Sequence, residues 1–211
     1  MTQRWATTAG ALLLTLTLTS CGSDDHGGTV KTTVSGTCAL HRDKYALSPV
    51  SADRLRAALG PGTYTLTGDV SSDDRSDEDA HTATGGHRWG PPGLPIDGSC
   101  DYADSSGVRR LSVGIGQKDL PHSGYDDARR TQQTDPRAQK VDGADGYVIT
   151  EDVTDHDGSH AQQAVAVLFD GDNRYVTANI LVPTKGVDSA KEAVAIAREA
   201  LAAFNSRMRS A

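Results

Sequence analysis

Two histidines and two aspartates lie close together in the segment Asp155-His156-Asp157-Gly158-Ser159-His160. Imidazole nitrogens and carboxylate oxygens are common ligands of transition metals, so Asp155, His156 and His160 are candidate metal ligands. A calcium-binding EF-hand is excluded, because such a loop ends in a bidentate glutamate and position 166 is alanine. A solvated hairpin turn explains the same residues more simply, and we expect neither a bound metal nor another cofactor.

Side chains that could act as nucleophiles lack the partners that activate one. Ser123 follows His122, but the sequence offers no identifiable third group to orient that histidine, and G-x-S-x-G is absent. Gly114-Ile115-Gly116 lies in an expected strand with no helix N-terminus after it, unlike a phosphate-binding loop. His81 and His87 are most simply residues of a surface loop. We therefore expect that the protein is not an enzyme.

A third kind of chemistry, lipid attachment to a cysteine, is indicated near the start of the chain. Residues 1–20 have a cationic beginning with Arg4 and an apolar stretch from Trp5 to Leu18, as a secretory signal peptide does. This stretch is too short and too rich in threonine to cross a bilayer, which takes about 20 apolar residues. Leu18-Thr19-Ser20-Cys21 has the order of the lipobox of bacterial lipoproteins. We predict that Cys21 carries the lipid.

Lipidation at Cys21 would hold the mature protein on the extracytoplasmic face of the cell membrane through acyl chains, palmitate among them. An ordinary cleaved signal peptide is the alternative. Removal of residues 1–20 takes away one positive charge, Arg4, so the formal net charge goes from −7 to −8. Such a charge argues against nucleic acid as a partner and against a polybasic contact with anionic lipid.

Cys38 and Cys100 are the remaining cysteines. In an oxidising compartment, a single pair of cysteines favours a disulfide bond. Two free thiols or half of a metal site are the alternatives, and the absence of C-x-x-C spacing argues against the metal site. Closing so long a loop removes about 4 kcal/mol of unfolded-chain entropy. We predict a disulfide with Cα atoms about 4.4–6.8 Å apart.

The composition fits one domain with a long polar insertion, since hydrophobic residues make up only 36% of the chain and aromatic residues 5%. Residues 21–37 are expected to form a flexible tether, and residues 38–211 a single domain. Within it, the acidic and proline-rich range from about 69 to 95 is expected to be a disordered surface insertion. Its Trp89 either marks a contact site or folds back onto the domain.

Helical patterns occur near both ends of this domain. Ser48-Pro49 offers an N-cap and a first helical proline, and Leu59-Gly60 ends the helix. A second helix is predicted from Ser189 to Asn205, where Ser189 and Glu192 have capping-box spacing. At most a short helix is expected over 126–133.

Strand patterns fill much of the region between these helices. Alternating apolar residues or β-formers predict strands at 63–67, 108–117, 146–152, 163–169 and 174–182, with a hairpin turn at 170–173. The N-terminal and C-terminal helices must cover the apolar face of this sheet. The predicted fold is therefore α+β, an antiparallel sheet packed on an N-terminal and a C-terminal helix in two layers.

Several short motifs follow one another in a recognisable order. Cys38-Ala39-Leu40 leads into the helix that ends Leu59-Gly60, Cys100-Asp101-Tyr102 precedes Leu111-Ser112-Val113, and Val141 to Tyr147 is a glycine-bearing stretch. With the lipobox and tether, this order resembles the DUF3558-like family of actinobacterial secreted lipoproteins. The sequence departs from that pattern in having Tyr102 where tryptophan is common, and in its acidic, histidine-containing insertion. The resemblance implies a Mog1p/PsbP-like fold and brings no catalytic residues.

The sequence thus predicts a lipid-anchored lipoprotein of the cell envelope, a non-enzymatic binding or accessory module. The alternative is a small-ligand or metal-binding lipoprotein. The expected partners are the membrane, through the lipid on Cys21, and an envelope protein or a small ligand.

Overall fold

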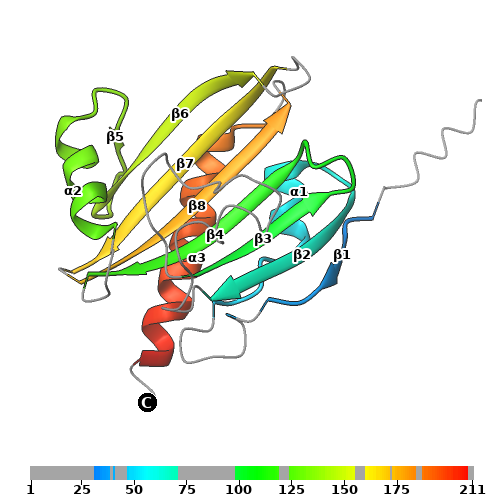
Figure 1. Ribbon diagram of the computed structural model, residues 1–211, viewed down its shortest axis with the longest axis horizontal. Coiled ribbons are helices and arrows are strands. Elements are labelled where there is room, and N and C mark those ends of the chain that lie inside the picture. Colours follow the sequence, from blue (N-terminus) through cyan, green and yellow to red (C-terminus); the bar gives the residue numbers. More distant parts are fainter. Residues whose placement is uncertain are drawn as a thin grey trace, which may run out of the picture.

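A computed structural model describes residues 31–38, 40, 47–70, 98–118, 124–154, 160–171, 173–183 and 187–208. Over these ranges the chain forms one eight-stranded sheet and three helices, which confirms the predicted α+β class (Figure 1). The helices are α1 (Ala52–Leu59), α2 (Tyr125–Thr134) and α3 (Ser189–Met208). The strands are β1 (Thr33–Gly36), β2 (Thr63–Val70), β3 (Gly98–Asp104), β4 (Arg110–Gln117), β5 (Gln139–Lys140), β6 (Gly146–Thr154), β7 (His160–Asp170) and β8 (Arg174–Pro183).

The strand order across the sheet is β1-β2-β3-β4-β8-β7-β6-β5. Strands β1 and β2 pair in parallel, and the other neighbours among these eight strands pair antiparallel. The predicted strands correspond to β2, β4, β6, β7 and β8. Strand β3 was not predicted, because its residues lie at the end of the polar insertion and before the alternating pattern of β4. Strand β1 lies within the range expected to be a tether.

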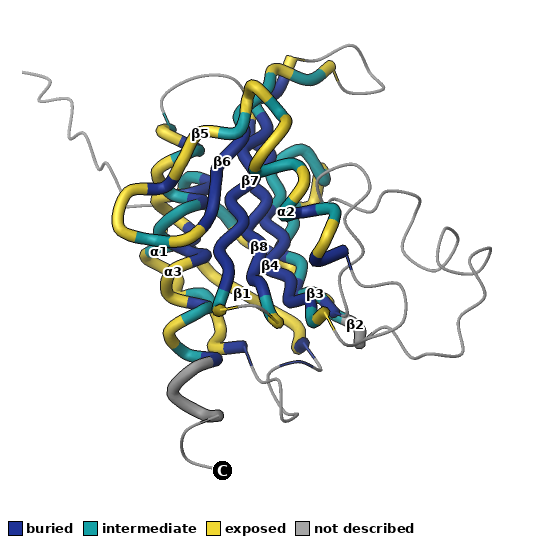
Figure 2. Tube along the Cα trace, turned by 90° about the vertical axis from the view of Figure 1, so that its left-hand side faces the viewer, coloured by how far each residue is buried: buried dark blue, intermediate teal, exposed yellow. Residues whose placement is uncertain are grey.

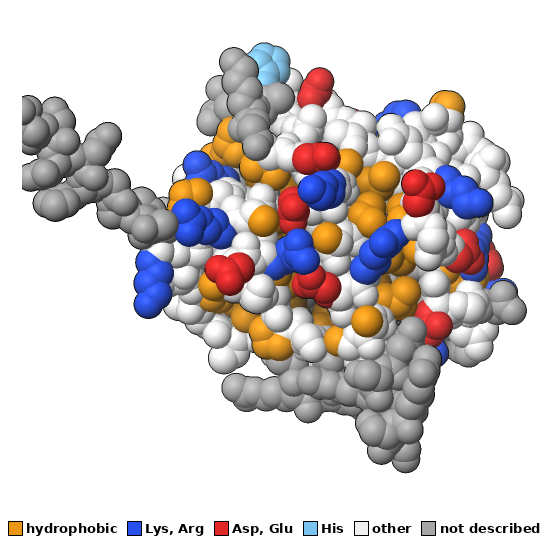
Figure 3. Space-filling view, turned by 180° about the vertical axis from the view of Figure 1, so that it is seen from behind, with side chains coloured by type: hydrophobic (Ala, Val, Ile, Leu, Met, Phe, Trp, Pro, Cys, Tyr) orange, Lys and Arg blue, Asp and Glu red, His pale blue; other side chains and the backbone are white. Residues whose placement is uncertain are grey.

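Helices α1 and α3 lie on one face of the sheet, as predicted, and α2 lies on the other (Figure 2). Alternation in β4 directs Leu111, Val113 and Ile115 into the core beneath α1 and α3. From α3, the fully or nearly fully buried residues of this core are Ala193, Ile196, Ala197, Ala200 and Phe204. The side that α1 and α3 cover shows cationic and anionic side chains side by side rather than a patch of one sign (Figure 3).

Helix α2 adds a partial third layer that the two-layer expectation lacked. Its Tyr125 and Ala128 pack on an aromatic cluster that includes Tyr147, Phe169 and Tyr175. The helix itself was expected over 126–133. Its polar sequence gave no indication that it covers the opposite face of β6, β7 and β8.

Two predicted helix starts are wrong in their capping residues. Helix α1 begins after Ser51 rather than Ser48, because the Ser51 side chain accepts a hydrogen bond from the backbone N–H of Arg54 at 3.2 Å. At α3, the side chain of Asp188 accepts from the N–H of Lys191 at 3.1 Å. The buried Ser189 instead donates to Oε1 of Gln162 at 2.5 Å and does not form the predicted capping box.

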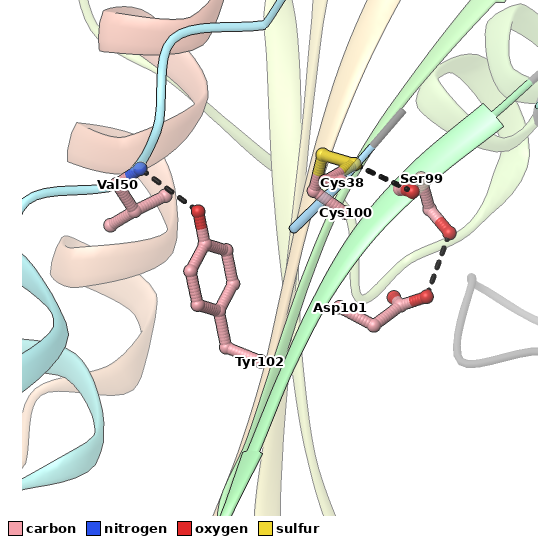
Figure 4. The surroundings of a disulfide bond; sticks show 6 residues. All are labelled: Cys38, Val50, Ser99, Cys100, Asp101 and Tyr102. Atoms are coloured by element: carbon pink, nitrogen blue, oxygen red, sulfur yellow. Dashed lines mark hydrogen bonds between the residues drawn. A yellow bond between two sulfur atoms is a disulfide. The ribbon is translucent and has the colours of Figure 1, made fainter. Parts of the chain in front are cut away.

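Cys38 and Cys100 form the predicted disulfide, with their Cα atoms 5.6 Å apart (Figure 4). The bond joins the segment after β1 to β3, two strands further into the sheet, and so does not lie at the sheet edge as expected. Gly68 on β2 makes room for it: a Cβ there would lie 2.2 Å from Sγ of Cys38. That sulfur also lies 3.5 Å from the carbonyl oxygen of Ser99, a contact without a donated proton because a disulfide sulfur carries none.

Several predicted features lie outside the described residues. They are the signal peptide and Cys21, residues 71–95 of the predicted insertion with His81, His87 and Trp89, and the pairs His122–Ser123 and Asp155–His156. Among the helices that the structure describes, none is long and apolar enough to cross a membrane.

Candidate functional site

A row of polar side chains crosses the sheet on the face away from α1 and α3. The strand register places Asp101 on β3 opposite Ser112 on β4, and Ser112 opposite Asn179 on β8. Residues directly opposite one another point to the same face, and adjacent strands are about 4.8 Å apart, so this row spans about 10 Å. We call Asp101, Ser112 and Asn179, with their hydrogen-bond partners Ser99 and Gln163, the Asp101 row.

Strand alternation places this row, because the residues next to its members in the sequence fill the core on the other face of the sheet. Cys100 and Tyr102 are buried on the side of α1, so Asp101 between them must point away, as Figure 4 shows. In β4, Leu111 and Val113 enter the same core, and Ser112 therefore faces with Asp101. The disulfide further fixes β3 at this point.

The Asp101 row is internally hydrogen-bonded, and part of it is buried. Ser99 Oγ donates to Asp101 Oδ2 at 2.9 Å, and Gln163 Nε2 donates to Asn179 Oδ1 at 3.0 Å. Ser112 and Asn179 are 7% and 3% exposed. Polar side chains this deeply buried and oriented by neighbours keep a defined geometry.

Asp101 is the electrostatic centre of the row. Burial raises the pKa of its carboxyl group, and hydrogen bonds from Ser112 and Ser99 partly offset that rise. Over the described ranges, no ion pair includes Asp101. Arg110 shares this face by register, but its Nε donates to the carbonyl oxygen of Gly107 in the β3–β4 turn. The row thus offers a carboxylate and hydroxyl oxygens as acceptors.

Among the residues that the structure describes, two of those predicted to do chemistry come together, Cys38 and Cys100. His160 is an exposed residue at the start of β7, and the proposed metal ligands Asp155 and His156 lie outside the described part of the chain. Within the described part, no three His, Cys, Asp or Glu side chains lie close enough together to hold a metal ion. The metal hypothesis for the Asp155–His160 segment therefore stays a prediction.

Sequence reasoning did not identify the Asp101 row. The alternation of Ser99-Cys100-Asp101-Tyr102 contained the signal, because a buried cysteine and a buried aromatic residue flank the acid. That signal becomes informative only once residues 98–104 are known to be a strand paired with β4.

A scan with protein-family models and a search of curated proteins both gave no match to this chain. The resemblance to DUF3558-like lipoproteins accordingly rests on the motifs of the sequence alone.

Proposed function

We propose that this protein is a lipid-anchored lipoprotein of the cell envelope, of the DUF3558-like kind, whose folded domain is a non-enzymatic binding or accessory module. Two features support this proposal from different parts of the chain. The lipobox at Cys21 supports the anchor, and the Asp101 row supports binding. The disulfide fits an oxidising compartment outside the cytoplasm.

The partly buried carboxylate of Asp101, without an ion-pair partner among the described residues, is the observation that carries the binding function. Removing a carboxylate from water without a cationic partner costs stability, and a neutral side chain at this position would cost less. Groups whose ionisation is disfavoured in this way are concentrated at functional sites. A binding partner that forms an ion pair or hydrogen bonds with the carboxylate would explain why an aspartate occupies this position despite its cost in stability.

The small-ligand form of the alternative function is favoured by one observation, the burial of the part of this face on β4 and β8. Ser112, Asn179 and Thr177 are each less than one-tenth exposed, so a broad, flat protein surface would reach them poorly. A metal-binding function would instead have to involve the Asp155–His160 segment.

The anchor is tested by replacing Cys21 in the full-length protein. Cys21→Ala removes the thiol that would carry the lipid, so we expect the variant to leave the membrane fraction or to retain its signal peptide. Membrane fractionation and intact-mass spectrometry measure both outcomes. The control Ser23→Ala lies two residues away and should behave like the unaltered protein. A processed Cys21→Ala variant retained fully in membranes would contradict the anchor.

The binding function is tested with a photo-crosslinking amino acid placed on either face of the domain in intact cells. Thr67 is exposed and pairs directly with Asp101, whereas Arg56 is exposed on α1 on the other face. We expect a discrete adduct, of a small molecule or a protein, from position 67 and none from position 56. No adduct at position 67, or the same adducts at both positions, would contradict a binding function of this face.

A further inference from the structure

The two edges of the described sheet are protected to different degrees. The β5 edge is two residues long and has charged side chains around it: Arg137 Nη1 lies 2.9 Å from Glu151 Oε2, and Lys140 on β5 and Asp152 on β6 are exposed. Charges of this kind discourage another strand from pairing with an edge. Strand β1, at the other edge, has the sequence Thr-Val-Ser-Gly, with neither a charge nor a proline (Figure 1). The β1 edge therefore lacks the protection that the β5 edge has.

The outer side of β1 presents backbone groups that another strand could pair with. The N–H of Thr33 donates to the carbonyl oxygen of Gly62 at 3.1 Å, so Thr33 bonds toward β2. Successive residues of a strand direct their N–H and C=O groups to opposite sides. Val34 and Gly36 therefore direct these groups away from β2, to a side on which no described strand lies.

Val34 adds an apolar contact to this edge. It is 39% exposed, and no other large hydrophobic residue in the described part of the chain is classed as exposed. Val34 pairs with Tyr64 and Gly36 with Leu66, so both face the side of the sheet that carries the core beneath α1 and α3. An exposed valine thus lies two residues from a position without a side chain, on the same side of the same strand.

Strand β1 is also held in place before any partner arrives. Cys38 follows β1 by two residues and is bonded to Cys100 on β3, and Oγ1 of Thr33 lies 3.1 Å from Oγ1 of Thr63 on β2. A segment that is already ordered loses little conformational freedom when it binds. The edge is therefore a preformed template for a further strand.

We propose that two copies of this protein associate through β1, with the two strands antiparallel about a two-fold axis at Ser35. In this register Val34 of each copy pairs with Gly36 of the other, and each outward N–H meets a C=O. Each Val34 side chain lies opposite a glycine, which leaves room for it, and the two valines approach one another diagonally. On the opposite face the two Ser35 hydroxyls lie across from one another. The edge is thus complementary to itself, which is the reason for choosing a second copy as its occupant.

The small size of this interface makes it dependent on the membrane. A four-residue strand pairing with its own copy buries far less than the about 1,200 Å² at which specific, stable interfaces begin. The pairing is therefore weak between molecules in solution. Confinement of both copies to one membrane raises their effective concentration. The inference thus rests on the proposed lipid anchor, and it is independent of the Asp101 row.

The length of chain between the lipid and β1 allows this arrangement. Cys21 and Thr33 are twelve residues apart, and an extended chain spans at most about 3.6 Å per residue, so the reach is about 40 Å. In the antiparallel pair the two Thr33 residues are offset by four residues of about 3.3 Å each, or about 13 Å along the strands. Both anchors can therefore lie in the same membrane surface.

Cysteine crosslinking of the full-length protein in intact cells tests the register. Ser35→Cys places two thiols directly opposite one another, with Cβ atoms about 4.5–5.5 Å apart, close to the separation in a disulfide. We expect a disulfide-linked dimer on a non-reducing gel. The matched control is Thr33→Cys, on the same face of the same strand and equally exposed. Its two thiols would be about 13 Å apart, so it should give little dimer.

Two further substitutions in the Ser35→Cys protein test what holds the copies together. Val34→Lys puts a charge from each copy on the shared edge and should lower the dimer fraction at least about tenfold, whereas the neutral, β-branched Val34→Thr should keep most of it. Cys21→Ala, which removes the proposed anchor, should also lower the dimer fraction. In the unaltered protein, amide exchange at Val34 should slow as the ratio of protein to lipid in vesicles is raised, because the N–H of Val34 gains a partner.

Equal dimer formation by Ser35→Cys and Thr33→Cys, or an undiminished dimer with Val34→Lys, would overturn the pairing through β1. So would a crosslink from Ser35→Cys to a different protein in place of the dimer. Absence of the dimer in protein that fractionates with membranes would overturn the pairing and leave the anchor standing. A dimer that persists after Cys21→Ala has released the protein would overturn its dependence on the membrane.

Discussion

A single buried phenol joins the interior of the sheet to the entry of the first helix. Tyr102 on β3 is 1% exposed, and its hydroxyl accepts a hydrogen bond from the backbone N–H of Val50 at 3.0 Å (Figure 4). This contact gives a physical reason for a tyrosine at position 102, where the DUF3558-like proteins that the sequence resembles commonly have tryptophan. An indole N–H is only a donor and could not accept from Val50.

Replacing Tyr102 with phenylalanine should destabilise the protein by about 1–2 kcal/mol, because the N–H of Val50 loses its partner. Tyr147→Phe is the matched control. The Tyr147 hydroxyl is buried without a hydrogen-bond partner, burial raises its pKa to about 12, and Thr131 lies near it but outside hydrogen-bonding geometry. Removing that hydroxyl should cost nothing. Chemical denaturation measures both, and equal losses would contradict the role of the Tyr102 bond.

The raised pKa of Asp101 predicts how the stability of the folded protein depends on pH. Its pKa is higher in the folded than in the unfolded protein, so between the two values the folded state binds more protons. Stability should therefore fall as the pH rises above about 4 through this interval. Asp101→Asn should raise the melting temperature at neutral pH, whereas Asp152→Asn should not. Calorimetry from about pH 4 to neutral pH measures the difference, and a lower melting temperature for Asp101→Asn throughout would contradict it.

For single residues, the sequence predicted which face of a strand each side chain occupies, because that depends on local alternation alone. Leu111-Ser112-Val113 has a period of two, so the buried side of β4 was predictable from three adjacent residues. The role of Asp101 depends on its pairing with Ser112 eleven residues later and on Asn179 a further strand away. Non-local pairing of this kind leaves no local signal.

Among the elements, α2 is the one whose position needs an explanation, because eight of its ten residues are polar. Its attachment comes largely from Arg129. The guanidinium lies 3.7 Å from the centre of the Phe169 ring, donates to Asp145 Oδ2 at 2.7 Å, and donates to the carbonyl oxygen of Gly171 at 2.9 Å. One arginine thus connects the helix to β7, to the β7–β8 turn and to the loop before β6.

Arg129→Ala should weaken this attachment. We expect a loss of about 1–3 kcal/mol, since it removes a cation–π contact and charge-assisted hydrogen bonds. The next residue supplies the control: Arg130 is exposed and pairs with Asp127 on the same helix, so Arg130→Ala should change stability by less than about 0.5 kcal/mol. Hydrogen exchange should quicken in α2 for Arg129→Ala alone. Equal effects of the two substitutions would show that α2 is held by its apolar residues.

The presence of each helix was more predictable than the residue that caps its N-terminus. The apolar spacing of α3 identified its length and its core side within a few residues, because that pattern repeats over five turns. The caps depend on single side chains, and more than one serine or aspartate near each start can serve. At α3, Asp188 caps the helix and Ser189 does not, because the Ser189 hydroxyl is used in the contact with Gln162. At α1, Ser51 caps the helix in place of Ser48.

The described helices cover the two ends of the sheet unequally. Strands β6, β7 and β8 have α3 on one face and α2 on the other, whereas β2 and β3 meet a described helix only on the side of α1 and α3. At that less supported end, β1 is a four-residue edge strand whose residues are all exposed. Apolar burial contributes little to holding β1, so its attachment depends on pairing with β2 and on the covalent link that follows it.

The disulfide should therefore matter most at the β1 end of the sheet. Its cysteines are 62 residues apart, and opening so long a loop returns about 4 kcal/mol of chain entropy to the unfolded state on the chain-entropy model. Replacing both cysteines with alanine should cost about 2–5 kcal/mol in the free energy of unfolding. Hydrogen exchange should quicken first in β1 and β2, while β7 and β8 keep the protection that α2 and α3 provide.

Alkylation without reductant provides the control, because intact protein should leave Cys38 and Cys100 unlabelled. Uniform loss of protection across all eight described strands would contradict the localised role, since it would mean that the bond stabilises the sheet only as a single cooperative unit. Unchanged stability would contradict the bond's contribution altogether. A selective loss at β1 and β2 would instead mean that the disulfide compensates, at one end of the sheet, for the apolar contacts that α2 and α3 supply at the other.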